Sequence, residues 1–147
     1  MHKQTPGQKR HLVADTLGQV LLVIMHSASL QDGAGGLLTL QKLFDRIKHN
    51  LHNRGCRLTL IGADGAYTSI VEKVRQPFGW TLEIVKRSDD MKRFQVLPRR
   101  WVVERTFGWL GRYRRLARDD EHTTLSSGTM VDVASIHRMF RLLSGQT

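Results

Sequence analysis

RLTLIGADGAY, residues 57–67, joins a short apolar run to an Asp-Gly turn. An apolar run of this length that ends at a turn predicts a buried strand over 57–63. Residues 69–76 then have a helical pattern that Pro77 should end, and residues 80–85 form a second apolar strand. This strand–helix–strand order indicates a mixed α/β fold.

The segment before this stretch predicts a hairpin followed by a helix. Residues 9–16 alternate as a strand does, Leu17-Gly18 forms a turn, and residues 19–27 give a second, more apolar strand. After a glycine-rich break, leucines recur at helical spacing, so residues 36–53 should form an amphipathic helix. The two strands and the helix agree with the α/β class.

The segment after this stretch predicts two more helices. Residues 98–115, PRRWVVERTFGWLGRYRR, should form an arginine-rich helix that follows Pro98. A last helix should span residues 127–143. We expect its apolar face to belong to the core; that face consists of Met130, Val133, Ile136, Phe140 and Leu143.

Size and composition limit the class of protein. The chain has 147 residues and 40% hydrophobic content, as expected for one globular domain over residues 1–147. Its longest apolar run has six residues, far below the roughly 20 that cross a bilayer, so we expect a cytoplasmic protein without a membrane span. Cys56 is the single cysteine, which excludes an internal disulfide framework.

Positive charge is concentrated in one part of the chain. Between Lys86 and Arg118, eleven Lys or Arg stand against three Asp or Glu, so this segment holds +8 of the net charge of +10. A solvated face explains many charge runs, but this excess is one-signed and mostly arginine. It favours a polyanion, and hence nucleic acid, as the partner.

Two carboxylates have a functional and a structural interpretation each. Asp64 follows a strand, where ligands of α/β sheets gather, but it can also cap the next helix. Glu104 can pair with Arg100 four residues earlier. It also shares a helical stripe with Gly108 and Gly111, whose small size would allow another backbone or a ligand to approach closely.

Four sequence blocks stand out along the chain: GQKRHLVADTLG at 7–18, ADGAY at 63–67, WTLEIVKR at 80–87 and LPRRWVVERTF at 97–107. Taken together, they resemble the catalytic part of bacterial insertion-sequence DDE transposases. They stand in the family's order, and the resemblance extends from about Gly7 to the last helix.

The resemblance implies a fold, a cofactor and a site. The fold would be ribonuclease-H-like, a mixed sheet flanked by helices, in which two aspartates and a glutamate hold two Mg²⁺ ions for attack on a phosphodiester. Asp64 matches the second aspartate, Glu104 the glutamate and Arg100 the family's arginine. The implied partners are the transposon ends and the target DNA.

The chain also departs from the family pattern. The family often has a tyrosine and a lysine where this chain has Leu97 and Gly111, and Arg112 is a candidate substitute for the lysine. The family's first strand and its aspartate should precede the block at 7–18, so we expect both to be missing. Asp15 and Asp32 are the carboxylates available to replace that aspartate.

The functional expectation is a truncated DDE transposase that is inactive alone or acts with a complementary N-terminal fragment or as a homo-oligomer. Two alternatives remain: a non-catalytic, basic DNA-binding remnant, and a metal-dependent nuclease of the same fold. The residues expected to contact DNA are Arg99, Arg100, Arg105, Arg112, Arg114 and Arg115.

Overall fold

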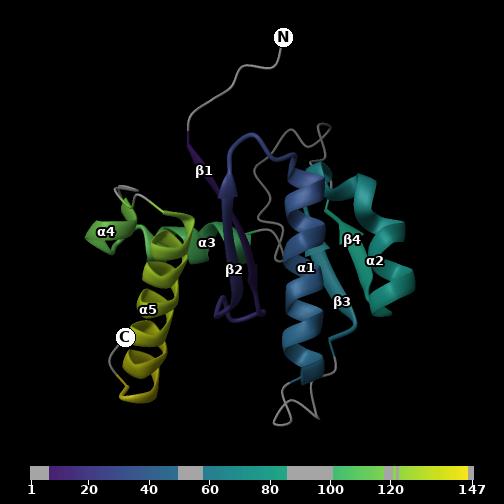
Figure 1. Cartoon of the computed structure of the whole chain (residues 1–147). Helices are drawn as coiled ribbons and strands as arrows, with labels where there is room; N and C mark the ends of the chain where they lie inside the picture. The colour runs from purple at the N-terminus through teal and green to yellow at the C-terminus, as the bar shows by residue number, and fades with distance from the viewer. Residues whose placement is uncertain (1–6, 50–57, 86–100, 118–120, 122, 146–147) are drawn as a thin grey trace, which may run out of the picture. The chain divides into compact units, whose positions relative to one another are not determined.

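Strands and helices alternate along the chain as the sequence predicts for a mixed α/β protein. The computed structural model describes residues 7–49, 58–85, 101–117, 121 and 123–145. Its elements are β1 (Gln8–Ala14), β2 (Val20–Ser27), α1 (Asp32–His49), β3 (Leu60–Ala63), the 3₁₀ helix η2 (Gly65–Ile70), α2 (Val71–Phe78), β4 (Thr81–Ile84), α3 (Trp101–Leu110), α4 (Arg114–Ala117) and α5 (Thr124–Leu143) (Figure 1).

The chain divides into two compact units. The first unit combines Met1–Ser29 with Val102–Thr147, and the second is Leu30–Trp101. In the first unit, β1 and β2 form the predicted antiparallel hairpin, and α5 packs against β2. Their core joins Leu110 and Leu116 to Val131 and Ala134 of α5, with Leu12 and Val23 of the hairpin packed against them. Segments from both ends of the chain thus build one core.

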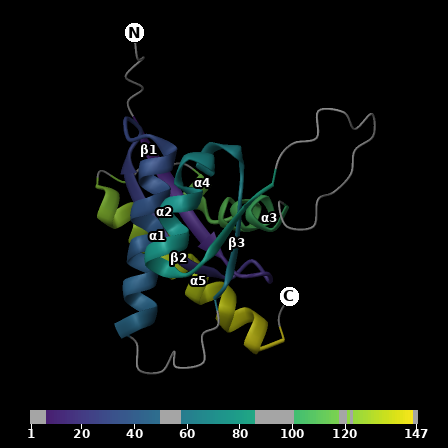
Figure 2. The ribbon, with the colours of Figure 1, turned by 90° about the vertical axis from the view of Figure 1, so that its right-hand side faces the viewer.

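The second unit is built on two parallel strands. β3 pairs with β4 in the register Leu60↔Thr81 to Ala63↔Ile84, and the connection between them is η2 followed by α2. Helix α1 packs against η2 and α2 (Figure 2). The aromatic rings of Phe44, Phe78 and Trp80 contact one another, with centroids 5.1–5.6 Å apart. This cluster ties α1 to the end of α2 and the start of β4.

The α/β class is therefore confirmed, and the finer architecture remains a prediction. Within the described ranges the strands form two sheets of two strands, one antiparallel and one parallel. A single ribonuclease-H-like sheet stays an expectation from the resemblance. No helix among the described residues is long and apolar enough to cross a membrane.

Several predicted helix bounds are wrong. The helix predicted over residues 98–115 is divided, since α3 ends at Leu110 and α4 begins at Arg114, and the last helix begins at Thr124 rather than at residue 127. Helix α1 begins at Asp32, so the glycines predicted to precede it lie in its first turns, where the Asp32 carboxylate favours a helix start. Pro77 does not stop α2, which continues to Phe78. A proline in the last turn removes only one hydrogen bond, and Gly79, at φ 67°, ends the helix instead.

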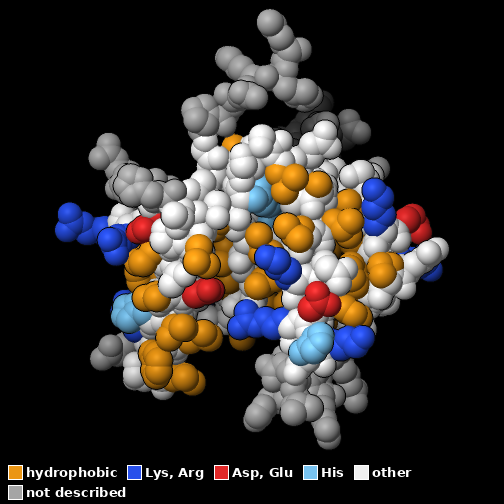
Figure 3. Space-filling model, viewed as in Figure 1, with side chains coloured by type: hydrophobic (Ala, Val, Ile, Leu, Met, Phe, Trp, Pro, Cys, Tyr) orange, Lys and Arg blue, Asp and Glu red, His pale blue; other side chains and the backbone are white. Residues whose placement is uncertain are grey.

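The predicted core face of α5 is confirmed at Met130, which is partly buried against the core, and is wrong at its other four residues. Phe140 and Leu143 are 68% and 85% exposed, and Val133 and Ile136 are about half exposed. The buried residues of α5 are Ser127, Val131, Ala134 and Ser135. Because these side chains are small, β2 can approach the helix closely. Figure 3 shows hydrophobic side chains gathered over α5.

Candidate functional site

Asp64 lies directly after the carboxyl end of β3. Its backbone is extended, and its Oδ1 accepts a hydrogen bond from the Ala66 N–H at 2.9 Å, so it is the N-cap of η2. The Asp64 carbonyl oxygen accepts a second bond, from the Tyr67 N–H at 3.2 Å. The capping interpretation is therefore confirmed. The side chain is nevertheless exposed, so its carboxylate can also be reached from solvent.

Two glycines of α1 allow η2 to approach it closely. A Cβ atom at Gly36 would lie 2.5 Å from Cε1 of the Tyr67 ring, and one at Gly33 would lie 2.7 Å from Oγ of Ser69. Both distances are too short for any side chain larger than glycine without movement of the neighbour. The glycine-rich segment thus sets the place of η2, and Asp64 is the cap of that helix.

Tyr67 is close to two carboxylates. Burial, together with the negative charges of Asp64 and Asp32, raises the pKa of Tyr67 to about 12. Asp32 and Asp64 both belong to the second unit, where the close approach of Gly33 and Gly36 to Ser69 and Tyr67 brings the start of α1 against η2.

Asp15 is hydrogen-bonded within the turn between β1 and β2. Its Oδ1 accepts hydrogen bonds from the N–H groups of Leu17 at 2.9 Å and Gln19 at 2.8 Å, and its carbonyl oxygen accepts from Gly18. Asp15 therefore holds the hairpin turn. Of the two aspartates considered as replacements, Asp15 belongs to the first unit, and Asp32 belongs to the second unit together with Asp64.

Glu104 lies in the first turn of α3 and is exposed. At about 100° per residue, Thr106 and Leu110 fall on other sides of the helix, and both are buried. The predicted pair with Arg100 lies outside the described residues. Among the described residues, nothing lies within 4 Å of a Cβ at Gly108, and Gly111 lies in the turn after the helix, so close approach of a ligand to these glycines stays a prediction.

Four residues connect the hairpin turn to α3 and α5: Gly18, Thr106, Trp109 and Arg138. The Gly18 carbonyl oxygen accepts bonds from Thr106 Oγ1 at 3.1 Å and from Arg138 Nη1 at 3.2 Å. The Arg138 guanidinium lies over the Trp109 ring, 3.3 Å from its centroid. Gly18 has φ +80°, which only glycine adopts without strain.

Arg105 and Arg138 both approach Trp109. The Arg105 guanidinium lies 4.6 Å from the ring centroid, and its Nη2 donates to the Leu17 carbonyl oxygen at 3.2 Å. Burial lowers the pKa of Arg138 from its ordinary value, and the charge of Arg105 lowers it further. Arg105 is thus engaged within the protein.

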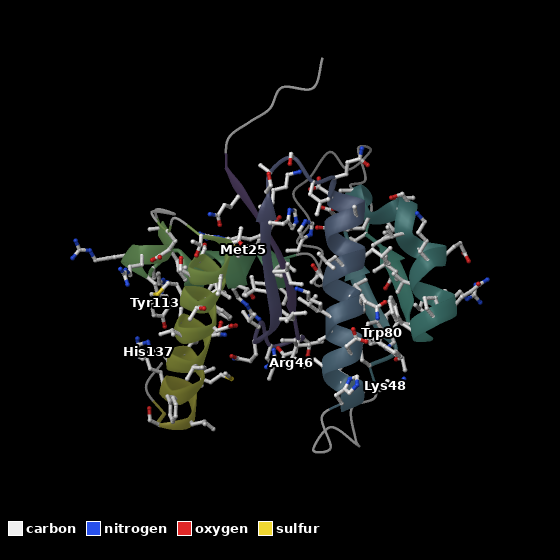
Figure 4. All side chains as sticks on the ribbon, viewed as in Figure 1. Met25, Arg46, Lys48, Trp80, Tyr113 and His137 are labelled. Atoms are coloured by element: carbon white, nitrogen blue, oxygen red, sulfur yellow. The ribbon has the colours of Figure 1, made fainter. Side chains whose placement is uncertain are left out.

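A second contact joins α5 to the turn after α3. The Tyr113 hydroxyl group and His137 Nδ1 are 2.8 Å apart, and their rings meet edge to face with centroids 5.7 Å apart (Figure 4). Helix α5 therefore contacts this region at two points, through His137 and Arg138.

The other arginines expected to contact DNA differ in their surroundings. Arg112 and Arg114 are exposed. Arg115 is exposed too, and its Nε lies 3.8 Å from a carboxylate oxygen of Glu121. Arg99 and Arg100 lie outside the described residues. The exposed positively charged surface of the first unit therefore includes Arg112, Arg114 and Arg115.

Asp64 and Glu104 belong to different units, Asp64 to the second and Glu104 to the first. Within the part of the chain that the structure describes, no three His, Cys, Asp or Glu side chains converge as metal ligands would. The surroundings of the Asp64 and Glu104 carboxylates are therefore each described within a single unit.

Sequence reasoning missed Tyr67, Thr106 and Arg138. Tyr67 stands in the ADGAY block, and its approach to Gly36 was signalled only by the glycines themselves. Thr106 follows Glu104 in the LPRRWVVERTF block. Arg138 gave no local signal, because its partner Gly18 is 120 residues away.

Most of the chain matches the model of one protein family. Residues 2–122 match the family model described as transposase DDE domain. No curated protein and no solved structure matches the sequence. The match contains both Asp64 and Glu104. The chain belongs to the transposase DDE domain family.

Proposed function

We propose that the chain acts in DNA transposition, with Asp64 and Glu104 as ligands of divalent metal ions and DNA as the substrate. The observation that carries this proposal is the family match over residues 2–122, which includes both carboxylates. The position of Asp64 also supports the proposal, because this residue follows the carboxyl end of a parallel strand, where ligands of α/β sheets gather.

The two side chains fit Mg²⁺ by their chemistry. Mg²⁺ prefers carboxylate and water oxygens, and both carboxylates are exposed. A bound metal ion would activate the attacking hydroxyl group and stabilise the leaving oxygen of the phosphodiester. The chain's own contribution is to hold the carboxylates: η2 orients Asp64 through the Ala66 N–H, and α3 carries Glu104 on its exposed side.

A third carboxylate belongs to the proposal. The candidates within the chain are Asp32, which borders Tyr67 in the second unit as Asp64 does, and Asp15, which accepts two backbone hydrogen bonds in the hairpin turn. The alternative source is another polypeptide, either a complementary N-terminal fragment or a second copy. In that case the chain alone would cleave DNA poorly.

The DNA contact of the proposal rests on exposed arginines. Arg112 and Arg114 are exposed, and guanidinium groups bind phosphates through paired hydrogen bonds. Arg115 adds a third positive charge to the same segment. Arg105 is assigned a structural role instead, since it donates to Leu17 and stacks on Trp109.

The test is cleavage and strand transfer on a DNA duplex with and without Mg²⁺. The wild type is compared with Asp64→Asn, Glu104→Gln and Asp32→Asn, and with Asp132→Asn as the control, since Asp132 is an exposed carboxylate of α5 outside the family match. We expect Mg²⁺-dependent products that Asp64→Asn and Glu104→Gln abolish and that the control retains.

Other outcomes would assign the chain differently. Cleavage without joining would indicate a nuclease. Salt-sensitive binding that is indifferent to Mg²⁺ and to Asp64→Asn would indicate the non-catalytic DNA-binding remnant. If activity appears only after a complementary N-terminal fragment is added, the third carboxylate comes from another polypeptide.

A further inference from the structure

We propose that Arg138 of α5 is a positioning residue that sets the direction of the Glu104 side chain. This inference rests on the proposed function, in which Glu104 is a metal ligand. It extends that function to a residue outside the family match, which ends at residue 122.

The geometry joins Arg138 to α3 in two ways. Its guanidinium lies 3.3 Å from the centroid of the Trp109 ring, and its Nη1 donates to the Gly18 carbonyl oxygen at 3.2 Å. The same carbonyl oxygen accepts from Thr106 Oγ1 at 3.1 Å. Arg138 thus contacts one side chain of α3 and shares an acceptor with another.

These contacts fix α3 against rotation about its own axis. Thr106 and Trp109 lie about 200° and 140° around the helix from Glu104, at about 100° per residue. Both are therefore on the side away from Glu104, and Thr106 is 2% exposed. Holding that side against the hairpin turn keeps Glu104 exposed in one direction.

Arginine suits this place better than lysine. A planar guanidinium can lie flat on an indole ring and donate a hydrogen bond in its plane at the same time. A lysine ammonium group keeps the charge but cannot make both contacts in that geometry. We therefore expect Arg138→Lys to restore only part of the effect that Arg138→Met removes.

The experiment measures Mn²⁺ binding near Glu104 in the full-length chain. Binding is monitored by the paramagnetic broadening of the Arg105 and Thr106 amide NMR signals. The variants are Arg138→Met, Arg138→Lys and Glu104→Gln. Arg141→Met is the matched control, because Arg141 is an exposed arginine in the last turn of the same helix. Circular dichroism verifies that each variant is folded at the temperature used.

We expect Arg138→Met to raise the Mn²⁺ concentration for half-maximal broadening about 10-fold, the effect typical of residues that orient a metal ligand. Arg138→Lys should fall between Arg138→Met and the wild type, and Arg141→Met should match the wild type. If Arg138→Met binds Mn²⁺ as the wild type does while Glu104→Gln loses the broadening, this inference is wrong and the proposed function stands. If Glu104→Gln keeps the broadening, Glu104 is not a ligand, and both are wrong.

A second pair of variants covers the case in which Arg138→Met does not fold. Thr106→Val removes the hydroxyl group that shares the Gly18 acceptor, and Thr106→Ser keeps it. We expect Thr106→Val to weaken Mn²⁺ binding and Thr106→Ser to leave it near the wild-type value. Equal Mn²⁺ binding by the folded Thr106→Val variant and the wild type would overturn the inference.

Discussion

The hydroxyl group of Thr106 lies 3.1 Å from the carbonyl oxygen of Gly18 and 2.8 Å from that of Val102, so its one proton is shared between the hairpin turn and the preceding turn of α3. A Cβ atom at Gly18 would lie 2.9 Å from both Thr106 Oγ1 and Trp109 Cζ3. Gly18 also has φ +80°. We therefore expect Gly18→Ala to lower the free energy of unfolding by about 2–4 kcal/mol, from backbone strain and crowding together.

Gly79→Ala separates the two causes. Gly79 has a similar φ of 67°, but no atom of the described residues lies within 4 Å of its Cβ position, so only the strain of about 1 kcal/mol applies. Chemical denaturation of both variants measures the difference. Equal losses of stability would mean that the hairpin turn does not pack tightly against α3.

Local pattern predicted the elements well and their packing less well. The hairpin at 8–27 and the strand before Asp64 were predicted because alternation and an Asp-Gly turn are local properties. The predicted burial of that strand is wrong, since Leu60 and Gly62 of β3 are exposed. The buried side of α5 was not, since hydropathy alone selects Phe140 and Leu143, whereas small side chains around Val131 allow β2 to approach. Close packing between elements depends on shape, which a periodic pattern does not encode.

In the candidate site too, the sequence predicted local positions but not the packing between elements. Asp64 could be found from its place after a strand. That Tyr67 lies near both Asp64 and Asp32 could not, because it follows from the packing of η2 on glycines of α1. The bond from Arg138 to Gly18 crosses 120 residues, and no local pattern marks either partner.

The glycine at position 36 gives a second test. Alanine usually stabilises a helix interior by about 1 kcal/mol relative to glycine. At Gly36 the new Cβ atom would lie 2.5 Å from the Tyr67 ring, so we expect Gly36→Ala to destabilise the protein by about 1–3 kcal/mol instead. Thermal unfolding monitored by circular dichroism measures the change.

Gly128→Ala is the matched control for Gly36→Ala. Gly128 lies inside α5, and its Cβ position is 3.6 Å from Met25 Cγ, an ordinary contact. We expect this variant to be as stable as the wild type or more stable. In addition, Tyr67→Ala should relieve the loss caused by Gly36→Ala in a double-mutant cycle. Additive losses would contradict the close contact.

Tyr67 predicts a fall of stability at alkaline pH. Its pKa is raised to about 12, while in the unfolded chain it is near 10, so above pH 10 the unfolded chain loses this proton first. Stability present below pH 10 should therefore decrease as the pH rises towards 12. The slope stays below about 1.4 kcal/mol per pH unit, because the side chain is only half-buried and water screens its charges.

Comparison with Tyr67→Phe isolates this contribution from other groups that titrate at high pH. Urea denaturation across pH 9 to 12 should show a steeper decline for the wild type. The chain has two tyrosines, so in Tyr113→Phe the tyrosinate absorbance reports Tyr67 alone. Half-ionisation near pH 10 in that variant would contradict the shift.

The exposed face of α5 predicts an unequal response to substitution. Val131 is fully buried, so Val131→Ala should cost about 1–3 kcal/mol of stability. Phe140 is 68% exposed, so Phe140→Ser should change stability by at most about 0.5 kcal/mol. Chemical denaturation of the two variants compares them directly. A large loss in Phe140→Ser would show that this face is covered in solution.

The exposed arginines predict how DNA binding depends on salt. Each arginine that neutralises a phosphate contributes about one unit to the slope of log affinity against log salt concentration. Arg112→Ala and Arg114→Ala should each reduce the slope by about this amount and weaken binding to unrelated sequences equally. Fluorescence anisotropy with a labelled duplex at several salt concentrations measures both effects. The control is Arg75→Ala, because Arg75 is an exposed arginine of α2 outside the arginine-rich segment.

Since Arg105 is engaged with Leu17 and Trp109, Arg105→Ala should instead lower thermal stability and leave the slope close to the wild-type value. A slope that falls in Arg105→Ala but not in Arg112→Ala or Arg114→Ala would reverse this assignment of the arginines.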